Sequence, residues 1–277
     1  MSQEHPGSQG LGRNRPAVLT IAGSDSGGGA GLQADLRVLA AHGVHGVTAV
    51  TAVTAQNTRA VTAVDPVSPR MVAAQVRAVF DEFEIGAVKT GMLATAAVVE
   101  AVCEALDAHP GPPLVVDPVI AATSGRRLLD EDAVAVVRDR LLRRARVVTP
   151  NRFEAEVLAA QPVASPDDAR RAAARIRALG AAAALVTGGH FDGDESIDVL
   201  DDGGVVVELC GPRIAGRQTR GTGCTFSAAV AAGLAAGLPL AEAAARAKRY
   251  VEGAIRNAAG AGRGPGPLHY FWRNERQ

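Results

Sequence analysis

The sequence predicts an α/β fold whose mostly parallel central sheet is covered by helices on both faces. Short Val-rich runs alternate with longer Ala-, Leu- and Arg-rich stretches of helical spacing, and this alternation is typical of parallel sheets. Hydrophobic residues make up 47% of the 277 residues, but aromatic residues only 3%. The core must therefore be built from Ala, Val, Leu and Ile.

Each expected element has a simple signal. Short apolar runs rich in β-branched residues predict strands at 17–22, 44–55, 60–64, 87–90, 114–117, 146–149 and 183–187. Apolar residues three and four apart predict helices at 31–41, 69–83, 95–108, 130–142, 152–160 and 166–179. Two runs at 197–200 and 205–210 predict a hairpin, because a polar turn separates them. Ala-rich helices are expected at 223–237 and 240–257.

The chain is interpreted as one domain over residues 17–277, because no linker divides it. Residues 1–16 are polar, rich in Gly and Pro, and lack the apolar core of a signal peptide, so we expect a disordered tail. No apolar run reaches the ~18 residues of a membrane span. Three scattered Cys argue against a disulfide scaffold and favour the reducing cytoplasm.

Charge argues against two classes of partner. The 29 basic and 29 acidic residues cancel, which disfavours nonspecific nucleic-acid binding and a polybasic membrane surface. We therefore expect a small-molecule ligand at the carboxyl ends of the strands, where ligands bind in open parallel sheets.

Two Gly-rich turns are the first candidates for that site. Residues 23–31 hold five Gly in nine positions, which favours a ligand loop over a simple flexible turn, although no Walker or dinucleotide motif is present. The second turn, Gly221-Thr222-Gly223-Cys224, precedes an Ala-rich helix, and three N–H groups there form an anion hole for a transferred phosphoryl group. Cys224 is expected to have a depressed pKa in that first turn; the alternative is a plain N-cap and a buried Cys.

A third cluster leaves two interpretations open. Asn151 and Glu154 lie three residues apart after a strand, which suits either the orientation of a hydrated Mg²⁺ or an ordinary capping box. Asp117 and Gly189 follow two further strands. The convergence of these turns on one sheet edge is the argument for a site.

Seven segments in order carry a specific resemblance. They are AGSDSGGGAGLQADL (22–36), TAVTAQNT (51–58), KTGML (89–93), VVDPVIAATSG (115–125), TPNRFEAEVL (149–158), TGGH (187–190) and RGTGCTFSAA (220–229). Together they resemble the hydroxymethylpyrimidine/phosphomethylpyrimidine kinases of thiamine biosynthesis, in the ribokinase-like superfamily. The resemblance runs from about residue 17 to residue 272. Because the chain ends at Gln277, we expect no fused thiamine-phosphate synthase.

The resemblance implies roles at the pyrimidine end. Asp35 and Gln56 match the residues that hydrogen-bond the aminopyrimidine, whose donor and acceptor edges suit a carboxylate and an amide. The walls around the ring match Gly23, Ala30, Met92 and Val119.

It also implies roles at the phosphate end. Gly221, Thr222 and Gly223 match the anion hole, and Cys224 stands where sugar-kinase relatives carry an Asp base. The ATP and Mg²⁺ positions match Asp117, Asn151, Glu154, Thr187 and Gly189. Of these, Asp117 and Glu154 are expected to hold Mg²⁺ through water.

Two positions depart from the family pattern. Thr123 and Thr187 stand where many members carry Lys, and both replacements remove positive charge near phosphates. Arg126, Arg127 or Arg220 are candidates to compensate. The second phosphorylation, whose substrate is more negative, is the step that these losses affect most.

The expected activity is ATP- and Mg²⁺-dependent phosphorylation of 4-amino-5-hydroxymethyl-2-methylpyrimidine and then of its monophosphate. One alternative is a pyridoxal/pyridoxine kinase, against which the pair of Gln56 and Asp35 argues. Another is a non-catalytic ligand-binding regulator, against which the intact Gly221–Cys224 turn, Asp117 and Glu154 argue. The related enzymes suggest a homodimer.

Overall fold

The sheet is mostly parallel, as predicted. The computed structural model describes residues 17–122, 125–189, 191, 193–214, 219–258 and 260–273, so the expected N-terminal tail lies outside them. The strands of the main sheet are β1 (Ala17–Asp25), β2 (His45–Gln56), β3 (Val61–Pro66), β4 (Ile85–Thr90), β5 (Leu114–Val116), β6 (Val147–Val148), β7 (Ala183–Val186), β8 (Glu195–Asp202) and β9 (Val205–Pro212). Their spatial order is β3-β2-β1-β4-β5-β6-β7-β8-β9. From β2 to β7 in this order neighbours are parallel, while β3, β8 and β9 add antiparallel edges.

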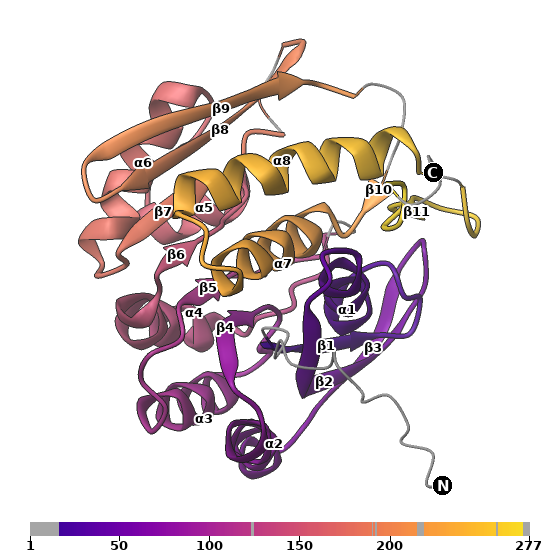
Figure 1. Cartoon of the computed structure of the whole chain (residues 1–277), viewed down its shortest axis with the longest axis vertical. Helices are drawn as coiled ribbons and strands as arrows, with labels where there is room; N and C mark the ends of the chain where they lie inside the picture. Colours follow the sequence, from indigo (N-terminus) through magenta and orange to yellow (C-terminus); the bar gives the residue numbers. More distant parts are fainter. Residues whose placement is uncertain are drawn as a thin grey trace, which may run out of the picture.

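Helices cover both faces of this sheet (Figure 1). The helices are α1 (Gly31–Ala41), α2 (Pro69–Glu82), α3 (Ala96–Asp107), α4 (Glu131–Val136), α5 (Arg152–Ala159), α6 (Pro166–Ala178), α7 (Thr222–Ala235) and α8 (Leu240–Arg256). One apolar core lies between the sheet and α2 to α6, and a second between the sheet and α1, α7 and α8. Alternation along β1 feeds both cores, because Leu19 and Ile21 enter the first and Val18 the second.

The Ala-rich composition of α7 and α8 permits very close packing. A Cβ added to Gly233 of α7 would lie only 2.8 Å from the Cβ of Ala243 in α8. Larger side chains at this crossing would force the helices apart. The close approach explains how a chain with few aromatic residues still fills its interior.

Two local features differ from the sequence expectation. The helix expected over 130–142 ends as an α-helix at Val136, continues as a π-helical turn over Val137–Leu141 and closes with a 3-10 turn over Leu142–Arg144. The apolar pattern does not distinguish these hydrogen-bond registers, since Leu141 and Leu142 are buried in any case. The pairing of β10 (Thr219–Arg220) with β11 (Gly266–Pro267) was also not predicted, because two-residue strands have no period to detect.

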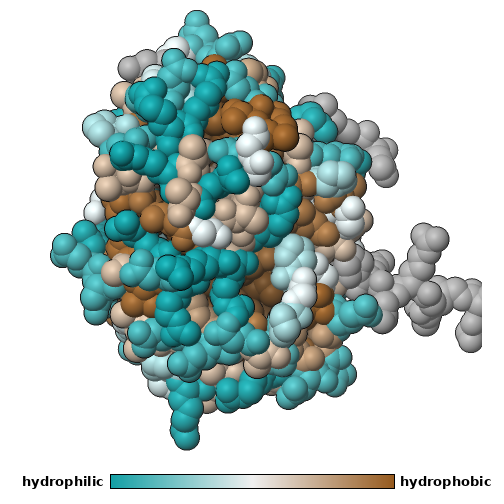
Figure 2. All heavy atoms as spheres, turned by 90° about the vertical axis from the view of Figure 1, so that its left-hand side faces the viewer, coloured by the Kyte–Doolittle hydropathy of each residue, from teal (hydrophilic) through white to brown (hydrophobic). Residues whose placement is uncertain are grey.

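One face of the molecule is mostly hydrophilic. On the side of α6 and the β8–β9 hairpin, hydrophilic side chains cover most of the face and apolar ones form small separate groups (Figure 2). No helix of the described residues is long and apolar enough to cross a membrane.

Candidate active site

The predicted convergence at one sheet edge is confirmed. Asp25 ends β1 and Gln56 ends β2, while Asp117 and Asn151 come shortly after β5 and β6. Because these strands are parallel neighbours, their carboxyl ends meet at one edge. The N-terminus of α7 reaches the same place, since Ser227 Oγ donates to Asp117 Oδ2 at 3.0 Å.

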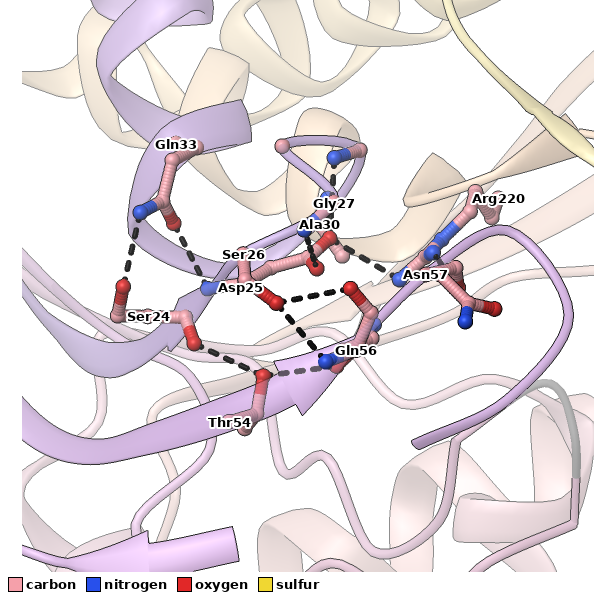
Figure 3. A network of polar contacts seen from close by, with 12 residues as sticks. Ser24, Asp25, Ser26, Gly27, Ala30, Gln33, Thr54, Gln56, Asn57 and Arg220 are labelled. Atoms are coloured by element: carbon pink, nitrogen blue, oxygen red, sulfur yellow. Dashed lines mark hydrogen bonds and ion pairs between the residues drawn. The ribbon is translucent and has the colours of Figure 1, made fainter. Parts of the chain in front are cut away.

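The first Gly-rich turn is organised around an internal carboxylate. Asp25 Oδ1 accepts from the backbone of Gly27 at 2.8 Å, and Asp25 Oδ2 accepts from Gly29 at 2.9 Å and Ala30 at 2.8 Å (Figure 3). The Arg220 guanidinium closes the cluster 3.0 Å from Asp25 Oδ2. Because these three N–H groups already donate to the Asp25 carboxylate, they are not available to a phosphate.

The walls expected around the pyrimidine ring lie together in part. Met92 and Val119 belong to one small apolar cluster with Ala52 and Ala94. A Cβ on Gly23 would lie 3.1 Å from Met92 Sδ, so glycine there leaves room beside the thioether. This cluster is therefore a surface of the right chemistry for a flat ring.

Ala30, the fourth expected wall residue, is not in this cluster but packs against Gly221 at the start of α7. A Cβ added to Gly221 would lie 3.4 Å from Ala30 Cα and only 2.0 Å from the carbonyl oxygen of Gly29. Since Gly221 also has a φ of 80°, glycine is required there on both steric and conformational grounds. The ring wall and the anion hole are in this way held in contact.

Gln56 is placed by the turn that Asp25 organises (Figure 3). Ser26 Oγ donates to the Gln56 carbonyl and accepts from its N–H, both at 2.8 Å. The Gln56 Oε1 atom accepts from Thr54 Oγ1 at 3.2 Å. No described residue accepts a hydrogen bond from Gln56 Nε2, so this donor is available to a ligand.

Asp35, the second predicted pyrimidine contact, is fully buried. Its Oδ2 accepts from Thr20 Oγ1 at 2.6 Å and lies 2.8 Å from Lys89 Nζ. Sequence reasoning assigned no role to Lys89. A lone lysine inside an apolar strand was the available signal, because such a charge is buried only with a partner.

The N-terminus of α7 has the form expected for an anion hole. Gly221 is its N-cap, with no side-chain cap and no acidic residue in the first turn. The first N–H groups of a helix have no intrahelical partner, and among the described residues no side chain caps the start of α7. An anionic group is favoured at such a terminus.

The expected depressed pKa of Cys224 is wrong. Burial, with the Asp117 and Asp35 carboxylates nearby, raises the pKa of the thiol to about 12, although the Lys89 ammonium and a hydrogen bond from the Gly31 backbone oppose the shift. Desolvation and like charge outweigh the helix terminus. Cys224 is therefore a neutral thiol at physiological pH.

The Asn151 and Glu154 pair forms a capping box at the start of α5. Asn151 Oδ1 accepts from the Glu154 backbone at 3.1 Å, and Glu154 Oε2 accepts from the Asn151 backbone at 2.9 Å. Glu154 is nevertheless buried, and burial together with the Asp117 carboxylate raises its pKa to about 8. The pKa of Asp117 is also raised, chiefly by burial.

These two carboxylates fit a divalent cation. Each destabilises the charge of the other in a buried position, so a cation nearby would favour the ionised form of both. Hard oxygen donors suit Mg²⁺, which keeps several waters and takes one or two carboxylates. The capping interpretation and the metal interpretation are thus compatible.

Fewer contacts are seen among the residues expected to bind the nucleotide. Thr187 follows β7 and its backbone N–H donates to the Pro150 carbonyl at 2.9 Å, while Gly189 is exposed. Thr123 lies outside the described residues. Two of the candidate compensating arginines are engaged elsewhere, since Arg220 pairs with Asp25 and Arg126 donates to the Val61 carbonyl at 2.7 Å.

An open α/β sheet with an uncapped helix N-terminus beside buried carboxylates suits a small-molecule enzyme that binds phosphate at the sheet edge. The solved structures that resemble the chain place it in the class of ribokinase-like small-molecule kinases. The chain belongs to the phosphomethylpyrimidine kinase family, which it matches over residues 25–269.

Relatives and solved structures agree with this assignment. The chain is 49% identical over 259 residues to the hydroxymethylpyrimidine/phosphomethylpyrimidine kinase of Rhizobium meliloti (strain 1021), covering 92% of this chain and 97% of that protein. It is 46% identical to the thiamine biosynthesis bifunctional protein ThiED of Geobacter sulfurreducens, covering 93% of this chain but only 52% of that one. The chain thus spans about half of the bifunctional relative.

Among solved structures, the chain is similar to an ADP complex of Bacillus subtilis pyridoxal kinase, with a TM-score of 0.87 and 34% identity over 94% of this chain and 99% of that chain. It is also similar to phosphomethylpyrimidine kinase from Clostridium difficile 630, with a TM-score of 0.77 and 36% identity over 87% and 100% of the two chains.

Proposed function

We propose that the protein transfers the γ-phosphoryl group of ATP to the hydroxymethyl group of 4-amino-5-hydroxymethyl-2-methylpyrimidine, and then phosphorylates the resulting monophosphate. The observation that carries the proposal is the uncapped N-terminus of α7, which lies beside the buried carboxylate of Asp117 and against Ala30. Family membership supports the same reaction.

Binding of the pyrimidine is assigned to the wall and its two polar neighbours. Met92 and Val119 pack against the ring, and the free Nε2 of Gln56 donates to a ring nitrogen. Asp35 is assigned a second hydrogen bond to the pyrimidine, although in this structure it is buried and accepts from Thr20 and Lys89. Its burial means that it comes within reach of the ligand only through a local shift of α1 or of the turn before it.

Phosphoryl transfer then requires positioning more than covalent chemistry. The hydroxyl oxygen attacks the γ-phosphorus as the bond to ADP breaks, and the N–H groups at the start of α7 stabilise the oxygens that gain charge. Cys224 orients the hydroxyl as a neutral thiol, and the hydroxyl proton leaves late, onto a phosphate oxygen. Asp117 and Glu154 are the residues that would hold Mg²⁺, which neutralises phosphate charge when bound.

A pyridoxal kinase is the second candidate, because pyridoxal kinases from Bacillus subtilis and Staphylococcus aureus have TM-scores of 0.87 and 0.85 with this chain. ADP release measured with hydroxymethylpyrimidine, its monophosphate and pyridoxal distinguishes a pyrimidine kinase from a pyridoxal kinase. Mass spectrometry identifies each product. We expect turnover of both pyrimidines at higher kcat/KM than pyridoxal. Turnover of pyridoxal alone would reverse the assignment, and ligand binding with no ADP release would indicate a regulator.

The setting of this activity is proposed to be the cytoplasm, since Cys103, Cys210 and Cys224 are all free thiols. A homodimer is the proposed assembly. Light scattering on the purified protein tests this assembly, and the mass of a monomer would refute the homodimer.

A further inference from the structure

Lys89 is a fully buried cation at the centre of the site. It lies in β4, and its Nζ is 2.8 Å from Asp35 Oδ2, 3.1 Å from Asp35 Oδ1 and 3.9 Å from Asp117 Oδ2. Asp35 belongs to α1 and Asp117 follows β5. One ammonium group therefore contacts a carboxylate from the pyrimidine end and another from the phosphate end.

The chain leaves room for this group. A Cβ added to Gly91 would lie 2.9 Å from Lys89 Nζ and 3.1 Å from the Cβ of Ala22. Any residue with a side chain at position 91 would have to displace the Lys89 ammonium group or Ala22 of β1. The glycine that follows β4 is thus explained by the lysine within it.

Lys89 is paired with carboxylates that are as inaccessible as itself. Asp35 and Asp117 are both buried, and an ionised carboxylate in such a place needs a cation. Lys89 is therefore the cation of a buried ion pair with Asp35.

We propose that Lys89 is a positioning residue for phosphoryl transfer, because its ammonium group ties Asp35 to Asp117 and sets the charge that faces Cys224. The inference rests on the proposed function for its kinetic part alone. Asp117 is in turn bonded to Ser227 of α7, so the lysine also fixes one carboxylate against the helix that forms the anion hole.

The first test compares Lys89→Met with Thr20→Val. Both variants remove one donor to Asp35, but only the first removes a charge. We expect Lys89→Met to lower kcat by about 10²-fold, the usual effect of losing one electrostatic group at a reaction centre, with a smaller change in the KM for ATP. Thr20→Val keeps kcat within a few-fold. Equal losses in the two variants would mean that Lys89 only anchors Asp35, and would overturn the proposal.

The second test also removes the charge of Asp35, which Lys89→Met would leave without a partner cation. Lys89→Met leaves Asp35 buried without its cation, so the double variant Lys89→Met/Asp35→Asn is expected to regain thermal stability but not kcat. Recovery of both would show that the lysine serves folding only. If Lys89→Met does not fold, the double variant is compared with Asp35→Asn alone, so that both lack the proposed pyrimidine contact and only the lysine differs.

The third test needs no substrate. Iodoacetamide labelling of Cys224 is followed by peptide mass spectrometry at one fixed alkaline pH. Removing the ammonium group takes away a cation that favours the thiolate, so labelling should slow several-fold. Unchanged labelling would contradict the electrostatic link. A wild-type protein that phosphorylates no pyrimidine would instead refute the proposed function and leave this result standing.

Discussion

Replacing Glu154 by glutamine separates its capping role from its charge. Gln retains an oxygen that accepts from the Asn151 backbone, as a capping box allows, but it has no proton to lose. In the folded protein the pKa of Glu154 is raised from 4.5 to about 8. The folded state therefore holds a proton that the unfolded state releases, and stability falls as pH rises between these two values.

The magnitude follows from that shift. Each pKa unit corresponds to about 1.4 kcal/mol, so the wild-type protein without metal loses on the order of several kcal/mol above about pH 8. For a chain of this size, 1 kcal/mol moves Tm by about 2–4 °C. We expect Glu154→Gln to melt on the order of 10 °C higher than wild type at about pH 9, and at the same temperature below about pH 4.5.

Thermal melts across this pH range, with and without Mg²⁺, provide the assay. Mg²⁺ should raise the Tm of wild type at high pH and leave Glu154→Gln almost unchanged. Asp168→Asn is the matched control, because Ser165 and Asp168 form the same capping box at α6, on an exposed turn. If the Tm of wild type and the Tm of Glu154→Gln differ by the same amount at every pH, the reasoning is refuted.

Three further substitutions test individual contacts. Gln56→Ala should raise the KM for hydroxymethylpyrimidine by about 10- to 100-fold, the kinetic equivalent of a lost buried hydrogen bond of ~1–3 kcal/mol, without changing ATP binding. Thr54→Val loses the donor to the Ser24 carbonyl at 2.9 Å as well as the donor to Gln56 Oε1 at 3.2 Å, but it keeps the Gln56 amide, so it should have a smaller effect on this KM and none on ATP binding. Cys224→Ser should retain substantial kcat because a thiol with a pKa of about 12 orients the hydroxyl, whereas Cys224→Ala should not; full activity of the Ala variant would leave only a packing role. Tyr270→Phe removes the hydroxyl that donates to the Gly29 carbonyl at 3.1 Å, and should lower kcat a few-fold in steady-state assays; an unchanged kcat would show that Gly29 keeps its place without it.

The secondary structure was predictable where the pattern is long. The expected helix at 31–41 has the observed bounds of α1, and β2 differs from the expected strand by one residue at each end. The first strand is longer than expected, because Ser24 and Asp25 continue to pair with β2 beyond a bulge. Their Gly- and Ser-rich sequence resembles a turn, and only the pairing with β2 identifies it as strand.

The site was predictable at the level of position but not of charge. Sequence order and strand direction place Gln56, Asp117 and Glu154 at one edge, since topology alone decides that. The state of each group depends instead on burial and on neighbours distant in sequence. Lys89 lies 54 residues from Asp35, so the apolar strand around Lys89 signals a buried charge but not which carboxylate pairs with it.

The two Gly-rich turns differ in what their N–H groups face, and composition alone does not reveal this difference. Both offer several N–H groups beside glycine, and both lie at the carboxyl edge of the sheet. In the first turn Asp25 supplies an anion from within the chain and accepts from three of those groups. In the second, the N-cap is Gly221, which has no side chain to accept them. We therefore expect a glycine-rich turn to be open to phosphate only where the chain provides no carboxylate of its own. On that ground we propose that phosphate binds at the start of α7 and that the turn after β1 forms a wall of the site.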